Sequence, residues 1–143
     1  MHLCFEDKFM EIQTELISLC MEVTGSEVDK VFAYASIDKK SRMFNAFFEK
    51  EGKVLTLNEL NIVNGEAMGF LKTGTQELEK IKRVCEENQR KIPTEIKMYY
   101  DVKTGRFDAE YKYDEECLQK MSSGEIFMKW YEEIKGNEMK GEE

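Results

Sequence analysis

The chain has 143 residues, a net charge of −8 and a single proline. A chain of this length buries roughly two-thirds of the surface that it exposes when unfolded, which predicts one domain over residues 1–143 with one core. Hydrophobic residues make up 41% and charged residues 35%, which excludes a disordered composition. No apolar run approaches the ~18–20 residues that cross a bilayer, and so much negative charge repels phosphate backbones. We therefore expect binding to neither membranes nor nucleic acid.

Cysteine and histidine usage indicates the compartment and argues against a metal site. The four cysteines are far apart in sequence, without a CxxC pair, and are Cys4, Cys20, Cys85 and Cys117. The single histidine is His2. This pattern favours free thiols in a reducing cytosol, and two disulfides in an exported protein are the alternative. Acidic residues interrupt the first thirty positions, unlike a signal peptide, so we expect a cytoplasmic protein.

The first half of the chain predicts one helix followed by three short strands. Apolar residues from Phe5 to Leu19 recur every three or four positions, and Gly25 offers a stop. Strand-like stretches over 30–37, 43–50 and 54–57 are separated by turn residues, which predicts an antiparallel meander. In the first strand, Phe32 has the parity opposite to the expected core residues, so we expect it to be exposed.

The second half predicts helix, two strands and helix. Glycines in the segment 58–74 favour a loop. A second helix is expected to begin at Thr75 and to be ended by Pro93. Strands over 94–100 and 107–113 are joined by a hairpin, with Tyr99 on the outward parity of the first. In the second strand, four residues are expected to face the core: Phe107, Ala109, Tyr111 and Tyr113. A final helix after Ser122 or Ser123 has an aromatic stripe including Trp130 and Tyr131, and residues 136–143 are expected to fray.

The order of elements is therefore α-β-β-β-α-β-β-α. Strands gathered into antiparallel runs, with helices between them, predict an α+β fold of two layers in which helices pack on a sheet of about five strands.

The sequence shows no catalytic constellation. A nucleophilic triad needs a base beside the nucleophile, and His2 at the chain start is the single histidine. The carboxylate pairs are adjacent in sequence, so their side chains do not converge on one point. We expect no enzymatic activity, no cofactor and no metal ion.

The remaining indication of function is the distribution of charge along the chain. Residues 108–143 contain eleven acidic and five basic side chains, a net of −6, so most of the excess negative charge lies in the last quarter of the chain. This excess could serve solubility alone. Alternatively, it predicts a docking surface for a basic protein. The candidate docking residues are Asp108, Glu110, Asp114, Glu115 and Glu116, with Glu132 and Glu133 as further candidates.

The run from Gly105 to Asp114, Glu125-Ile126 and Trp130-Tyr131 resemble the YezG-like antitoxin family. Members of that family show a glycine–basic–phenylalanine hairpin, an alternating strand ending in tyrosine–aspartate, and a closing helix with tryptophan. The strands over 31–37 and 43–48 follow in the same order. One departure is Ile92-Pro93, where members of the family tend to have a tryptophan.

The resemblance implies a cytoplasmic immunity protein that binds and neutralises a cognate toxin domain, commonly a nuclease with a basic cleft. Inhibition could block the cleft or hold the toxin inactive. Two other functions remain open: a peptide- or protein-binding adaptor that uses a sheet edge or the aromatic side chains Phe32 and Tyr99, and an unrecognised hydrolase. The oligomeric state is left open.

Overall fold

The structure, a computed structural model, describes residues 4–38, 41–113 and 121–141. Within them the elements follow in the order α1 (Phe5–Val23), β1 (Lys30–Ile37), β2 (Arg42–Lys50), β3 (Lys53–Thr56), α2 (Asn64–Glu87), β4 (Glu95–Asp101), β5 (Phe107–Lys112) and α4 (Ser123–Gly141). The predicted fold class, α+β with helices on a five-stranded antiparallel sheet and this order of elements, is confirmed.

The strands form one sheet in the spatial order β3-β2-β1-β4-β5. The central strand β1 pairs antiparallel with both neighbours, so that Ala33 lies opposite Ala46 of β2 on one side and Met98 of β4 on the other. The β4–β5 hairpin turns at Gly105, whose φ of +75° is accessible to glycine at low cost. The last strand of the hairpin, β5, therefore forms one edge of the sheet.

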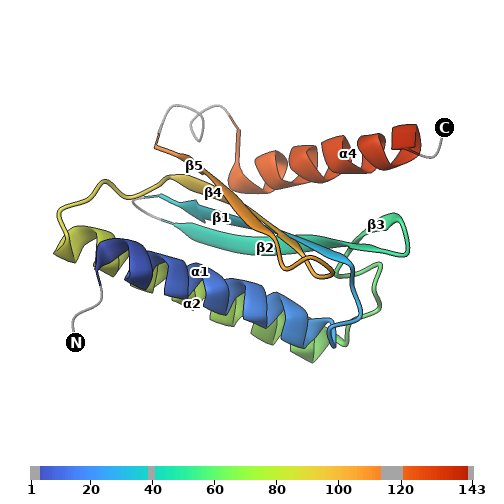
Figure 1. Ribbon diagram of the computed structural model, residues 1–143, viewed down its shortest axis with the longest axis horizontal. Helices are drawn as coiled ribbons and strands as arrows, with labels where there is room; N and C mark the ends of the chain where they lie inside the picture. The colour runs from blue at the N-terminus through green and yellow to red at the C-terminus, as the bar shows by residue number, and fades with distance from the viewer. Residues whose placement is uncertain (1–3, 39–40, 114–120, 142–143) are drawn as a thin grey trace.

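Helices cover both faces of the sheet, which gives three layers where the sequence predicted two. Helices α1 and α2 lie side by side on one face and α4 lies on the other (Figure 1). The reason is that β1 is apolar on both parities: Val31 and Ala33 face α1 and α2, whereas Phe32 and Tyr34 face α4. A strand buried on both faces reads as a continuous apolar run, as the residues from Val31 to Ala35 do.

An aromatic cluster joins α4 to the sheet. Phe32 of β1 and Phe47 of β2 stack with ring centroids 4.8 Å apart, and Trp130 of α4 meets Phe47 edge-on at 4.9 Å. Phe32 is consequently only 6% exposed, and Tyr99 beside it is half-buried. The prediction of exposure was wrong for Phe32, because the final helix packs on its face, whereas Tyr99 keeps part of the expected exposure. The predicted packing of Trp130 and Tyr131 is confirmed.

Two helices extend further than predicted. Helix α4 begins next to Ser122, whose side-chain Oγ accepts a hydrogen bond from the Glu125 N–H at 3.2 Å, and it continues to Gly141 through most of the expected tail. Helix α2 begins at Asn64 and includes the glycines that favoured a loop. Among the helices of the described residues, none is long and apolar enough to span a bilayer.

Gly74 has a packing role that explains one of these glycines. A Cβ built at this position would lie 2.1 Å from Cδ2 of the Phe44 ring, so only glycine lets α2 approach β2 this closely. Gly74, one of the glycines that suggested a loop, is therefore the point at which α2 contacts the sheet.

Substituting Gly74 by alanine is expected to lower the free energy of unfolding by about 1–3 kcal/mol, because the core must shift to admit the methyl group. Gly69 provides the matched control: it lies in the same helix, with nothing within 4 Å of a built Cβ. There, alanine should raise stability by about 0.5–1 kcal/mol, since glycine is the poorer helix former. Urea denaturation measures both, and equal effects would contradict the proposed contact.

Candidate protein-binding surface around β5

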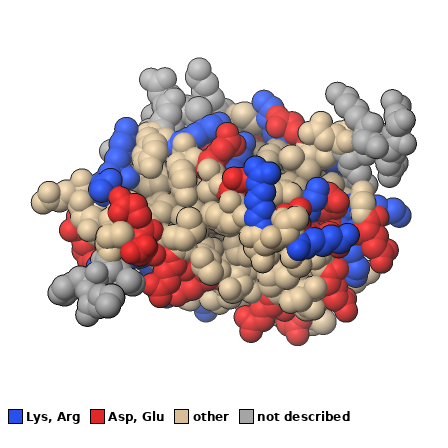
Figure 2. All heavy atoms as spheres, viewed as in Figure 1, with Lys and Arg blue, Asp and Glu red and all other residues tan. Residues whose placement is uncertain are grey.

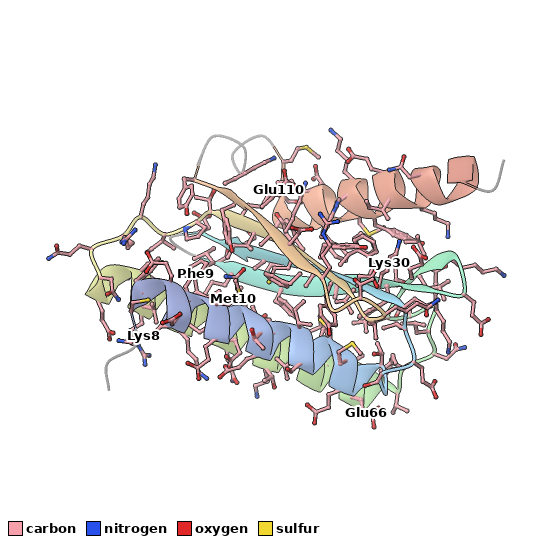
Figure 3. The ribbon with its side chains drawn as sticks, in the orientation of Figure 1. Lys8, Phe9, Met10, Lys30, Glu66 and Glu110 are labelled. Atoms are coloured by element: carbon pink, nitrogen blue, oxygen red, sulfur yellow. The ribbon has the colours of Figure 1, made fainter. Side chains whose placement is uncertain are left out.

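Two of the predicted docking residues, Asp108 and Glu110, lie exposed on one face of β5. That face is the one on which α4 packs, but α4 contacts β1, β2 and β3, lies beside β4 only through side chains such as Trp130 next to Lys97, and leaves β5 open. A groove of about 420 Å³ results between β5 and α4, bordered by Asp108, Glu110 and Trp130. We call this the β5–α4 groove. In Figure 3, Glu110 lies on the α4 side of β5.

Basic side chains are interleaved with these carboxylates. Arg106 Nε donates to Asp108 Oδ2 at 2.8 Å, and in the β4–β5 register Lys97 lies opposite Glu110. Lys97 Nζ is also 5.6 Å from the centroid of the Trp130 ring. From the residue before β5 to its last residue, one face therefore has a row of four charges. They are positive at Arg106, negative at Asp108 and Glu110, and positive at Lys112. On the face of the molecule that Figure 2 shows, blue basic and red acidic side chains are likewise interspersed. The face is a pattern of charges and not a uniformly acidic patch.

The structure describes two of the other predicted docking residues. Glu132 and Glu133 are exposed on α4, and Glu133 borders a hollow that adjoins the β5–α4 groove and shares Lys97 and Trp130 with it. The residues Asp114, Glu115 and Glu116 lie outside the described residues. Asp108, Glu110 and Glu133 are thus brought to one surface from two elements.

A second groove lies on the other side of β5, against α1, and has a volume of about 620 Å³. We call it the β5–α1 groove. Its wall includes three large hydrophobic side chains that are exposed to solvent: Met10 at 44%, Tyr111 at 36% and Tyr113 at 41%. Phe9 and Met10 lie where α1 faces β5 (Figure 3). Exposed apolar side chains grouped in this way are typical of surfaces that bind a partner.

The prediction that Tyr111 and Tyr113 belong to the core was therefore wrong. The parity was correct, since both face the α1 side, and Phe107 and Ala109 do pack on the core. However, β5 is the edge strand and α1 covers its end only in part. Periodicity indicates which face a side chain occupies, but not how far a helix extends over that face.

One hydrogen bond to a buried side chain anchors the β5–α1 groove. The Tyr111 hydroxyl donates to Gln13 Oε1 at 2.8 Å, and Gln13 itself is fully buried on α1. Gln13 Nε2 donates to the Phe9 carbonyl at 3.4 Å. Burial raises the pKa of the Tyr111 hydroxyl, which stays protonated and so remains a donor at neutral pH.

Replacing Tyr111 by phenylalanine is expected to lower the free energy of unfolding by about 1–2 kcal/mol, because Gln13 Oε1 is then left buried without its donor. Tyr113→Phe is the control, since Tyr113 is exposed on the same strand; its effect should stay within about 0.5 kcal/mol. Thermal or urea unfolding measures the difference. Equal stabilities for the two variants would contradict the bond to Gln13.

Neither the cysteines nor the carboxylates form a metal site among the described residues. Cys20 and Cys85 are buried free thiols whose pKa values are raised by burial, and Cys4 is exposed. Cys117 lies outside the described residues. In the part of the chain that the structure describes, no three His, Cys, Asp or Glu side chains group closely enough to hold a metal ion.

Comparison with known proteins finds no family whose model matches the chain and no curated protein of similar sequence.

Sequence reasoning missed the β5–α1 groove and the open edge of β5. A signal for the groove was present, because Met10 follows Phe9 on α1 and lies beside the predicted apolar stripe. No comparable signal in the sequence marks β5 as an edge strand, since the order of strands is set by tertiary pairing.

Proposed function

We propose that the protein is a non-enzymatic antitoxin that binds and neutralises the toxin domain of a bacterial competition system, with a basic nuclease as the expected target. The observation that carries this proposal is the exposed pair Asp108 and Glu110 on the edge strand of the sheet, with Glu133 close by on α4. It is supported by the resemblance of residues 105–114 to the YezG-like antitoxins and by the net charge of −8.

The geometry of these carboxylates suits contact with another protein better than catalysis. Side chains that exchange protons or attack substrates need pKa values tuned by burial. The Asp108 side chain is 57% exposed, and Glu110 also faces solvent. Exposed charges of this kind steer encounter and select partners of opposite charge. A nuclease cleft, which attracts phosphates, offers such a partner, and we expect the complex to form in the cytoplasm.

A peptide-binding adaptor is the second candidate function. The open edge of β5 favours it, because an exposed strand can pair with an extended peptide. Its other proposed basis, exposure of Phe32 and Tyr99, holds only in part, since Phe32 is buried under α4 and Tyr99 is half-buried. An adaptor for uncharged peptides should bind with an affinity that does not change with salt. The affinity of an antitoxin for a basic toxin domain should instead fall as salt is raised.

The test uses a candidate toxin domain, namely the basic C-terminal domain of a secreted protein encoded by a neighbouring gene. Expression of that domain alone is expected to stop cell growth, and co-expression with this protein should restore growth. The two chains should also elute together in gel filtration. Growth arrest that persists despite full expression of this protein, with no complex formed, would overturn the proposal.

A further inference from the structure

The edge formed by β5 is the longer open edge of the sheet. Within the described residues, β5 pairs with β4 on one side and with no strand on the other. The opposite edge strand, β3, has four residues against six in β5, and α4 packs against it. An unprotected edge strand is a template for pairing with another chain. In Figure 1, β5 crosses in front of β1 and β2, with α1 below it.

The backbone groups that face this edge can be identified from the ladder. The Asp101 N–H donates to the Arg106 carbonyl at 2.9 Å, which makes Asp101 and Arg106 a hydrogen-bonded pair. Such pairs alternate along an antiparallel ladder. The even-numbered residues from 106 to 112 therefore bond to β4, and Phe107, Ala109 and Tyr111 direct their N–H and C=O groups outward.

The two grooves flank this edge and differ in character. On the α1 side, a strand added to β5 would place alternate side chains over Met10, Tyr111 and Tyr113, which are exposed and mostly apolar. On the α4 side, its other side chains would lie beside Asp108 and Glu110, at the centre of the positive–negative–negative–positive row.

We propose that β5 accepts an extended strand of the toxin domain as a sixth strand of the sheet, with apolar side chains on one parity and two basic side chains facing Asp108 and Glu110. This inference rests on the proposed function, because it assigns the strand to the toxin. Main-chain hydrogen bonds to residues 107, 109 and 111 would supply affinity, and the alternate side chains would supply selectivity.

The charge pattern favours a basic strand over a second copy of this chain. Antiparallel pairing of two β5 strands centred on Ala109 would place Asp108 of one copy opposite Glu110 of the other, and Arg106 opposite Lys112. Like charges directly opposite one another destabilise a strand pair. A strand with two central basic residues instead makes favourable pairs at both acidic positions.

The probe is a capped synthetic peptide, TVKVKVT, with TVEVEVT as the control of opposite charge. NMR titration of the isotopically labelled protein is expected to show binding of the lysine peptide at least about tenfold tighter than that of the glutamate peptide. On binding, the amides of Phe107, Ala109 and Tyr111 should become protected from hydrogen exchange. The amides of Asp108 and Glu110 should already be protected in the free protein.

The variant Ala109→Pro tests the main-chain bonds directly. It removes an outward N–H without removing a bond to β4, and an edge strand tolerates proline at such a position. Ala109→Ser keeps the N–H and nearly the same volume. We expect A109P to weaken binding of TVKVKVT by at least about tenfold and A109S to leave it within about twofold.

Binding of the lysine peptide with residues 107, 109 and 111 still exchanging freely would overturn the proposal, and so would no binding. Because exchange is read on the unmodified protein, this holds even if A109P fails to fold. The peptide experiment is independent of the toxin. Growth rescue without strand pairing would leave the antitoxin function intact and remove this inference. Strand pairing without growth rescue would leave β5 as an acceptor of basic strands and overturn the assignment of the strand to a toxin.

Discussion

Replacing Asp108 and Glu110 together by lysine is expected to weaken binding of the toxin domain by more than about tenfold. Both side chains are exposed on the α4 side of β5, so the substitution turns the positive–negative–negative–positive row into four positive charges. A basic partner would then meet repulsion where it now meets attraction. The fold should survive, because exposed ion pairs such as Arg106–Asp108 contribute little to stability. Isothermal titration calorimetry measures the affinity, and circular dichroism checks the fold.

The matched control for this substitution is Glu86→Lys with Glu87→Lys. These two glutamates are exposed at the end of α2 and line neither the β5–α1 groove nor the β5–α4 groove, and the double change alters the net charge of the protein by the same amount. Lysine also suits the negative end of a helix. We expect E86K/E87K to change affinity by less than about threefold. Equal losses in the two double variants would show that net charge, and not the β5 surface, governs binding.

Truncating Phe47 to alanine is expected to lower the free energy of unfolding by about 3–5 kcal/mol, as for other large aromatic residues in protein cores. Phe47 is fully buried, stacks on Phe32, and meets Trp130 and Tyr131 of α4 with ring centroids 4.9 and 5.4 Å away. Its loss leaves a cavity under α4. Urea denaturation followed by the fluorescence of Trp130, the single tryptophan, measures the effect.

Met128→Ala on the same helix is the control, because Met128 is 44% exposed and should change stability by less than about 0.5 kcal/mol. A loss below about 1 kcal/mol for F47A would contradict the packing of α4 on the sheet. That packing matters for the candidate site, since α4 positions Glu133 and forms one wall of the β5–α4 groove.

Local periodicity predicted the elements well and their surroundings less well. The strand predicted over 30–37 coincides with β1, and the hairpin turn at Gly105 is where it was expected. The helical segment from Asn64 to Gly74 was missed, because glycine that allows a close approach cannot be told from glycine that breaks a helix without knowing its neighbour, Phe44.

For the candidate site too, the sequence predicted the side chains better than their surroundings. The parity of β5 correctly places Asp108 and Glu110 on the face opposite Tyr111, so their exposure could be predicted. Their basic neighbours could be predicted only in part, because Lys97 comes to Glu110 through strand pairing. The open edge of β5 depends on the order of all five strands, which no local pattern encodes.

The most direct test of the proposed mode of action is the affinity of this protein for the toxin domain as salt is raised from about 0.05 to about 0.5 M. If complementary charges guide the complex, the association rate and affinity should both fall steeply over this range, and the D108K/E110K variant should lose most of that dependence. An affinity that stays constant with salt, in wild type and variant alike, would contradict docking through the acidic side chains of β5.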